Sequence, residues 1–226
     1  MNVVFDFGAV LFTWRPAALL AHSFPRLVST PQQGAQLAQT VFGHEDWHNF
    51  DRGLLSMATV IERTAARLDL DTGALAELVH SIGDRLLPMD DTVALLAQLH
   101  TSRRPSAAGL AGKPGGDGTG AQGSHKNLKL YFLSNMPVPY ARTLEQKHSF
   151  LQWFDGGIFS GDVQHIKPEP AIYRLLQTRY ALEPTQTLFI DDLPGNVEAA
   201  RGLGWSGIHF ESAPQLQAQL AHLLCS

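Results

Sequence analysis

The sequence lacks several features that would place it in a specialised class of protein. Its single cysteine, Cys225, has no intramolecular disulfide partner, so we expect a reducing compartment. No stretch reaches the roughly 18 uninterrupted apolar residues of a membrane span. The apolar start has no basic leader and is interrupted by Asp6, which argues against a signal peptide. We therefore predict a cytoplasmic protein with no membrane partner.

Charged residues are also few, and neither sign dominates. They make up 17% of the 226 residues and leave a net charge of −4, spread along the chain. Binding to nucleic acid needs a basic stripe that neutralises phosphates, so nucleic acid is not an expected partner. A small phosphorylated metabolite remains possible, because it needs only a local positive group. The sequence gives no indication of the oligomeric state.

Hydrophobic residues, at 44% of the chain, suffice for the core of one α/β domain with a smaller insertion. Short apolar runs predict five strands, at residues 3–5, 128–133, 157–159, 187–190 and 206–210. Helical spacing of apolar residues follows several of them, at residues 170–180, 197–203 and 214–224. This alternation predicts a mainly parallel, doubly wound sheet with its sites at the carboxyl ends of the strands.

The segment between the first two strands is predicted to be helical throughout. Apolar residues recur there at helical spacing after the candidate N-caps Ser56 and Asp71. The predicted fold is therefore α/β, a Rossmann-like parallel sheet core with a helical cap inserted after the first strand. The core comprises residues 1–15 and 88–226, and the cap comprises residues 16–87. Seven of the chain's 20 glycines lie between residues 105 and 124, which predicts a flexible insertion in the core at about 103–126.

Three predicted strands end in polar residues, and a lysine stands in a loop just before a helix. These residues are Asp6, Ser134-Asn135, Asp191-Asp192 and Lys167. At one edge of a parallel sheet they would supply a carboxylate nucleophile, neutral donors, a fixed cation and a carboxylate pair. Phosphoryl transfer needs this combination, because it depends on positioning and on neutralising anionic oxygens. Mg²⁺ prefers one or two protein carboxylates, completed by water and substrate oxygens.

Each of these residues has an ordinary structural interpretation when taken alone. Asp6 could be a turn residue at a strand end, and Ser134-Asn135 could form a helix N-cap or a turn. Lys167 could be a solvated loop lysine. The adjacent Asp191 and Asp192 are harder to explain in this way, because they repel each other unless a cation or donors attend them. The functional interpretation therefore depends on the combination.

Four motifs in this order resemble those of the haloacid dehalogenase-like superfamily along essentially the whole chain. They read Val-Val-Phe-Asp6-Phe-Gly8, Leu-Ser134-Asn135, Lys167-Pro168-Glu169-Pro170 and Phe-Ile-Asp191-Asp192-Leu-Pro-Gly-Asn196. The helical segment is similar to the small caps of the subfamily that includes β-phosphoglucomutase and the haloacid dehalogenases. The Asp-x-Gly form of the first motif is similar to that of bacterial phosphatases acting on α-glucose 1-phosphate.

The resemblance implies Mg²⁺-dependent hydrolysis of a small phosphate monoester, a sugar phosphate being one candidate, through an aspartyl-phosphate. It implies that Asp6 is the nucleophile and that Lys167 orients Asp6 and the phosphate. The implied phosphate-binding residues are Ser134, Asn135 and Lys167, and the implied metal ligands are Asp6, the Gly8 carbonyl, Asp191 and Asp192.

Gly8 departs from the family pattern. Most phosphatases of this superfamily carry at that position a second aspartate, which acts as general acid and base. Such help is worth about 10²–10⁴-fold in rate. Either the leaving group needs little help, or turnover is slow, or the cap or the substrate supplies the proton. Cap residues that could face the site are His44, His48 and Arg52, although each could equally lie on a solvated helix face.

Two other functions remain open. One is a metal-independent 2-haloacid dehalogenase-like hydrolase, in which Asp6 attacks carbon. The pair Asp191-Asp192 favours a phosphatase over this, because dehalogenases need no metal. The other is a non-catalytic phosphate-binding or regulatory protein, suggested by the glycine at position 8.

Overall fold

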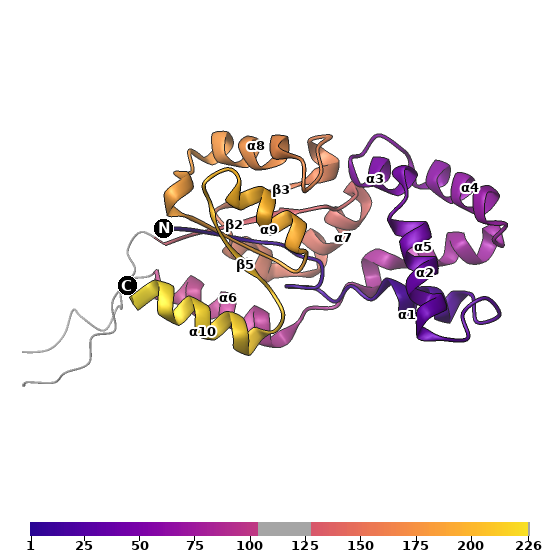
Figure 1. The fold of residues 1–226 in the computed structure, drawn as a ribbon, viewed down its shortest axis with the longest axis horizontal. Helices are drawn as coiled ribbons and strands as arrows, with labels where there is room; N and C mark the ends of the chain where they lie inside the picture. The colour runs from indigo at the N-terminus through magenta and orange to yellow at the C-terminus, as the bar shows by residue number, and fades with distance from the viewer. Residues whose placement is uncertain (104–127, 226) are drawn as a thin grey trace, which may run out of the picture.

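The centre of the protein is a five-stranded parallel sheet (Figure 1). A computed structural model describes residues 1–103 and 128–225 of the chain. The strands are β1 (Asn2–Phe5), β2 (Lys129–Ser134), β3 (Gly156–Phe159), β4 (Thr187–Asp191) and β5 (Ser206–His209). Their order is β3-β2-β1-β4-β5. The strands β2 and β4 flank β1, so the three strands with polar ends are neighbours.

Helices cover both faces of this sheet, as the apolar strand sequences require. One face packs against α8 (Pro170–Tyr180) and α9 (Pro194–Arg201), and the other against α6 (Asp90–Ser102) and α10 (Ala213–Cys225) (Figure 1). Neighbouring residues of β1 point to opposite faces, so Val4 joins the core under α8 and α9 while Val3 joins the other core. Among the described residues, short 3₁₀ helices are η2 (Ser149–Trp153), η3 (Ser160–Asp162) and η4 (Pro184–Gln186).

A five-helix cap follows β1 and lies beyond one end of the sheet (Figure 1). Its helices are α1 (Pro16–Ser23), α2 (Pro31–Phe42), α3 (Glu45–Asp51), α4 (Met57–Leu68) and α5 (Thr72–Arg85). The two predicted N-caps are present: Ser56 accepts a hydrogen bond from the backbone of Thr59, and Asp71 from that of Ala74. The predicted fold class, a Rossmann-like core with a helical cap after the first strand, is confirmed.

The chain leaves and re-enters the core along two connections that pair with each other. The Thr13 N–H donates to the Leu87 carbonyl at 2.8 Å, and the Leu87 N–H donates to the Thr13 hydroxyl at 3.2 Å. Phe12 and Pro88 form an antiparallel bridge just inside this pair. The pairing agrees with the predicted boundaries of the cap at residues 15/16 and 87/88, which stay a proposal.

One helix of the core was not predicted from the sequence. Helix α7 (Val138–Lys147) lies between β2 and β3 and packs against α5 of the cap. The Tyr140 hydroxyl of α7 donates to the Val79 carbonyl of α5 at 2.7 Å. Helix α9 also begins earlier than predicted, at Pro194 instead of Val197, because proline is well suited to the first turn of a helix.

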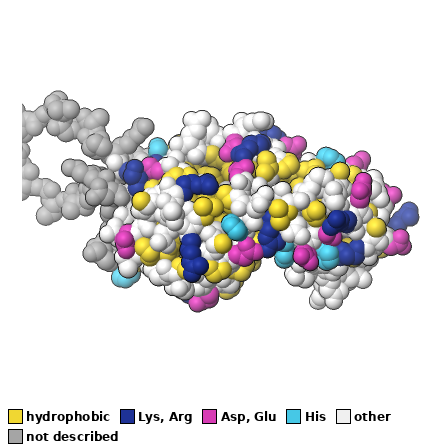
Figure 2. All heavy atoms as spheres, turned by 90° about the horizontal axis from the view of Figure 1, so that it is seen from above, with side chains coloured by type: hydrophobic (Ala, Val, Ile, Leu, Met, Phe, Trp, Pro, Cys, Tyr) yellow, Lys and Arg dark blue, Asp and Glu magenta, His cyan; other side chains and the backbone are white. Residues whose placement is uncertain are grey.

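The predicted Gly-rich insertion at about 103–126 lies outside the described residues, apart from Arg103. Within the described part of the chain, no helix combines the length and the apolar content that crossing a membrane requires. Acidic and basic side chains are interspersed on the face seen in Figure 2, over both the core and the cap.

Candidate active site

Asp6 lies where β1 ends, close to the centre of the sheet edge. Its backbone N–H donates to the Ile190 carbonyl of β4 at 2.9 Å, which continues the sheet pairing by one residue. Its side chain is buried, and Oδ1 accepts hydrogen bonds from the Phe7 N–H at 2.6 Å and from Lys167 Nζ at 2.8 Å. Among the described residues, nothing donates to Oδ2. One oxygen of Asp6 is therefore held in place while the other is left for chemistry.

Lys167 is the cation of this site, and it is almost completely buried. Its Nζ lies 2.8 Å from Asp6 Oδ1 and 2.6 Å from Asp191 Oδ2, and 5.5 Å from the centre of the Phe189 ring. Burial by itself lowers the pKa of Lys167, but the two carboxylates outweigh it and the pKa is raised. Lys167 therefore stays charged, and it ties the nucleophile to β4.

Asn135 holds the lysine through the backbone. Its Oδ1 accepts from the Lys167 N–H at 2.7 Å, and its Nδ2 donates to the Lys167 carbonyl at 3.0 Å. This reciprocal pair joins the loop after β2 to the loop before α8. Asn135 also lines the cavity described below, as Ser134 does. The predicted role of these two residues in binding phosphate stays a prediction.

Asp191 and Asp192 have different surroundings. Asp191 is fully buried, and its Oδ1 accepts from the Leu193 N–H and from Asn196 Nδ2, both at 2.9 Å. Since Oδ2 is taken by Lys167, both oxygens of Asp191 are satisfied. Asp192 faces the cavity, and burial together with the neighbouring Asp191 raises its pKa to about 6.

The carboxyl groups form a candidate metal site. Asp6, Asp191 and Asp192 each offer one oxygen, and these oxygens all lie within 4.8 Å of one another. An all-oxygen set of this kind suits a hard divalent cation such as Mg²⁺. Burial raises the pKa of Asp6 to about 7 against the attraction of Lys167, and a cation bound beside it would favour the ionised form.

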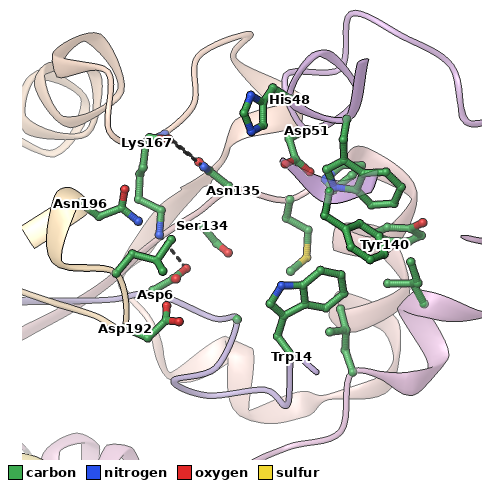
Figure 3. Close-up of a pocket in the computed structure, with 18 residues that line it drawn as sticks. Asp6, Trp14, His48, Asp51, Ser134, Asn135, Tyr140, Lys167, Asp192 and Asn196 are labelled. Carbon is green, nitrogen blue, oxygen red and sulfur yellow. Dashed lines mark hydrogen bonds and ion pairs between the residues drawn. The ribbon is translucent and has the colours of Figure 1, made fainter. Parts of the chain in front are cut away.

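A cavity of about 260 Å³ lies between this cluster and the cap (Figure 3). One side is polar and comes from the core. The opposite side is largely apolar and includes Trp14, Phe42, Trp47, Ile82, Leu86 and Tyr140. Gly8 also lines the cavity, and a Cβ at that position would meet only the Trp14 Cβ, at 3.8 Å. The position therefore has room for a larger side chain.

The three predicted cap residues lie in different places. His48 lines the cavity, and burial followed by the charge of Arg52 lowers its pKa. The His44 ring accepts from the Asp46 N–H at 3.1 Å and so caps the start of α3. Arg52 forms an ion pair with Glu169 of the third motif. Of the three, only His48 is among the residues that line the cavity, and their predicted roles in substrate recognition stay predictions.

Asp51 is the cavity residue that sequence reasoning missed. It ends α3 and lines the cavity from the cap side, across from Asp6 (Figure 3). Burial raises its pKa to about 8, although Arg52 and Lys167 oppose this. A signal was present in the sequence: Asp51 follows Trp47 by four residues, so on a helix it shares the face of a large aromatic residue.

Residues 43–204, more than half of the chain, match the family model of the haloacid dehalogenase-like hydrolases. The chain belongs to this family. It is 26% identical over 225 residues to the sesquiterpene phosphatase AstK of Aspergillus oryzae, covering 98% of this chain and 95% of that protein. It is 25% identical over 224 residues to the drimenol cyclase DrtB of Aspergillus calidoustus, where it spans only 36% of that protein.

Solved structures share the fold. A family enzyme of Bacteroides thetaiotaomicron in complex with magnesium and inorganic phosphate has a TM-score of 0.64 and 16% identity, with 93% of each chain covered. An L-2-haloacid dehalogenase of Xanthobacter autotrophicus has a TM-score of 0.59 and 21% identity, covering 91% of this chain and 75% of that one.

Proposed function

We propose that the protein hydrolyses a phosphate monoester with the help of Mg²⁺, through an aspartyl-phosphate on Asp6. The single observation that carries this proposal is the buried arrangement of Asp6, Lys167 and Asp191. Lys167 fixes one oxygen of Asp6, and the other oxygen remains available to attack phosphorus. A buried lysine paired with two carboxylates at a cavity costs desolvation, and a role in binding an anionic phosphoryl group explains its presence.

The donor set fits the cation. Asp6 and Asp192 would hold Mg²⁺, with the Gly8 carbonyl as a further ligand. Asp191, whose oxygens already accept three hydrogen bonds, would contribute mainly by orienting Lys167. Bound Mg²⁺ neutralises charge on the phosphoryl oxygens. Lys167, which pairs with Asp6 and Asp191, supplies a second positive charge beside the phosphoryl group. Ser134 lies at the end of β2, where it could donate to a phosphoryl oxygen (Figure 3).

The two alternative functions receive less support. A metal-independent dehalogenase would not need Asp192, which lies at the cavity, where burial and the neighbouring Asp191 outweigh the attraction of Lys167 and raise its pKa to about 6. A non-catalytic binding protein would not need a nucleophile with one oxygen fixed and one left open. The name of AstK, a sesquiterpene phosphatase related over nearly the whole chain, also favours a phosphatase.

We also propose that the leaving group is an apolar alcohol and not the sugar that the resemblance suggested. The cavity wall opposite Asp6 and Lys167 consists mainly of aromatic and aliphatic side chains, among them Trp14, Trp47 and Ile82. A sugar would bring many hydroxyls to this wall, where few groups can accept or donate hydrogen bonds, whereas a hydrocarbon gains from burial. A sesquiterpene alcohol is apolar in this sense.

The test is phosphate release from a panel that includes farnesyl phosphate and glucose 1-phosphate, with and without Mg²⁺. We expect Mg²⁺-dependent release, with a higher kcat/KM for farnesyl phosphate. Asp6→Asn should abolish release, while Asp162→Asn, which changes an exposed aspartate of the core, should retain it. Release that is indifferent to Mg²⁺ or to Asp6→Asn would refute the mechanism. A preference for the sugar phosphate would refute only the proposed leaving group.

A further inference from the structure

The cavity contains a carboxyl group that the proposed reaction does not use. Asp51 faces the cavity from the cap, across from Asp6 (Figure 3). Within residues 1–103 and 128–225, no side chain or backbone group donates a hydrogen bond to its carboxyl oxygens. Asp51 is half-buried, so its carboxyl group is open to the cavity and is free to contact a molecule bound there.

The neighbours of Asp51 hold it in place. The Ser160 hydroxyl of the core donates to the Asp51 carbonyl at 2.6 Å. Arg52 pairs with Glu169, and the backbone at Gly53 packs closely against Gly161. Contacts from three consecutive residues thus fasten the end of α3 to the core, so that the Asp51 side chain is presented to the cavity from a fixed backbone.

The surroundings of Asp51 keep its carboxyl protonated at neutral pH. Burial raises its pKa to about 8, with Arg52 of the cap and Lys167 of the core acting against the shift. The other titratable groups near it are His48 on α3, whose pKa is lowered by burial, and Tyr140 on α7, whose pKa burial raises well above its usual value. Both are therefore neutral at pH 7, and Asp51 is the acid among them.

We propose that Asp51 donates the proton to the leaving-group oxygen, the task for which Gly8 has no side chain. This rests on the proposed phosphatase function. Asp6 attacks phosphorus, the bond between phosphorus and the alcohol oxygen breaks, and its electron pair stays on that oxygen. The Asp51 proton passes to the same oxygen, so a neutral alcohol leaves and Asp51 becomes a carboxylate. Water then opens the aspartyl-phosphate, and the proton released in that step restores Asp51.

The experiment compares kcat/KM for p-nitrophenyl phosphate and for farnesyl phosphate. The parameter kcat/KM reports the steps up to departure of the alcohol. Nitrophenolate leaves readily without a proton, whereas an alkoxide does not. Asp51→Asn should therefore lower kcat/KM for farnesyl phosphate by about 10²–10⁴-fold and leave the value for p-nitrophenyl phosphate within a few-fold of wild type. Glu45→Gln, an exposed acid of the same helix, should change neither.

Two further readouts separate proton donation from a structural role. With farnesyl phosphate, kcat/KM of the wild type should fall as pH rises through about 8, and this fall should be missing with p-nitrophenyl phosphate. Adding Gly8→Asp to Asp51→Asn should recover part of the lost activity, since the Gly8 position has room for a side chain.

The outcomes are distinguishable. If Asp51→Asn lowers kcat/KM equally for both substrates, or for neither, Asp51 is not the proton donor. Activity of the wild type toward the aryl phosphate alone would also overturn the proposal. If the wild type releases phosphate from neither substrate with Mg²⁺, the proposed function itself fails.

Discussion

Four carboxyl groups lie in or beside the cavity, and they differ in how many hydrogen-bond donors contact their oxygens. Asp191 has a donor on each oxygen, and Asp6 has donors on one. Asp192 and Asp51 line the cavity with raised pKa values. In the proposed reaction this difference gives chemically identical groups different roles: Asp191 would position the lysine, Asp6 would react, Asp192 would bind the cation, and Asp51 would donate the proton.

The raised pKa of Asp51 has a measurable effect on stability. Because its pKa is about 8 in the folded protein and 3.8 in the unfolded chain, the folded state binds the extra proton between these values. The free energy of unfolding therefore falls as pH rises from about 4 to about 8. Asp51→Asn removes this penalty, so we expect the variant to match wild type near pH 4 and to exceed it increasingly up to pH 8.

Urea unfolding at pH 4.5, 6 and 8 measures this difference. Glu45→Gln should show no gain that grows with pH, because that carboxyl is exposed. A constant difference between Asp51→Asn and wild type at all three pH values would show that Asp51 is ionised in the folded protein. A residue that destabilises the fold while serving the reaction is typical of active sites.

At the scale of residues, the sequence predicted which residues of the core would come together, while their roles stay predictions. Asp6, Ser134, Lys167 and Asp192 all line the cavity, since apolar runs mark strand ends and parallel strands meet at one edge. The cap side was predicted poorly. Asp51 lies among other acids of α3, and which acid is buried depends on how the cap docks, which no local pattern specifies.

At the scale of elements, the site depends on how α3 meets the core. Gly53 has a φ of +74°, and a Cβ there would lie 2.4 Å from the Gly161 carbonyl oxygen. Gly53→Ala therefore brings both left-handed strain of about 1–2 kcal/mol and a backbone clash. We expect a lower Tm and a lower kcat/KM, because the clash pushes α3 and Asp51 away from the core.

Thermal unfolding and phosphate release together check this expectation. Gly195→Ala is the matched control for stability, since a Cβ there would meet nothing within 4 Å. It should leave the Tm unchanged or slightly raised. An unchanged Tm for Gly53→Ala as well would mean that α3 does not need its present contact with Gly161.

Element prediction succeeded for strands and failed for α7. The five strands are buried apolar runs, which stand out from their surroundings. Helix α7 has only Tyr140, Ala141 and Leu144 buried, and the rest of it is polar or follows prolines. Its helical conformation is fixed by packing against α5 of the cap, a contact between segments that are about sixty residues apart.

At the scale of the whole molecule, Mg²⁺ should stabilise the fold, because its proposed ligands directly follow β1 and β4. A cation that binds only the folded state adds about 2.7 kcal/mol when its concentration is 100 times its Kd. We expect MgCl₂ to raise the Tm above that in NaCl of equal ionic strength. Asp192→Asn should remove most of this increase.

Differential scanning fluorimetry over a MgCl₂ titration measures the effect. The exposed Asp84→Asn provides the control, and it should keep the full response to Mg²⁺. If Asp192→Asn keeps it too, the cation binds elsewhere.

The order of the strands, on which the site depends, could not be predicted from the sequence, because adjacency of β1 to β2 and β4 is set by long-range packing.

The paired connections at Thr13 and Leu87 restrict how the cap can move. Two paired backbone segments bend perpendicular to the plane that contains them more easily than they twist or slide past each other. We therefore expect the cap to rotate about a single axis once the contacts of Asp51 and Arg52 with the core are broken. Substrate would enter and alcohol would leave by one path, and every opening would carry Asp51 away from Asp6.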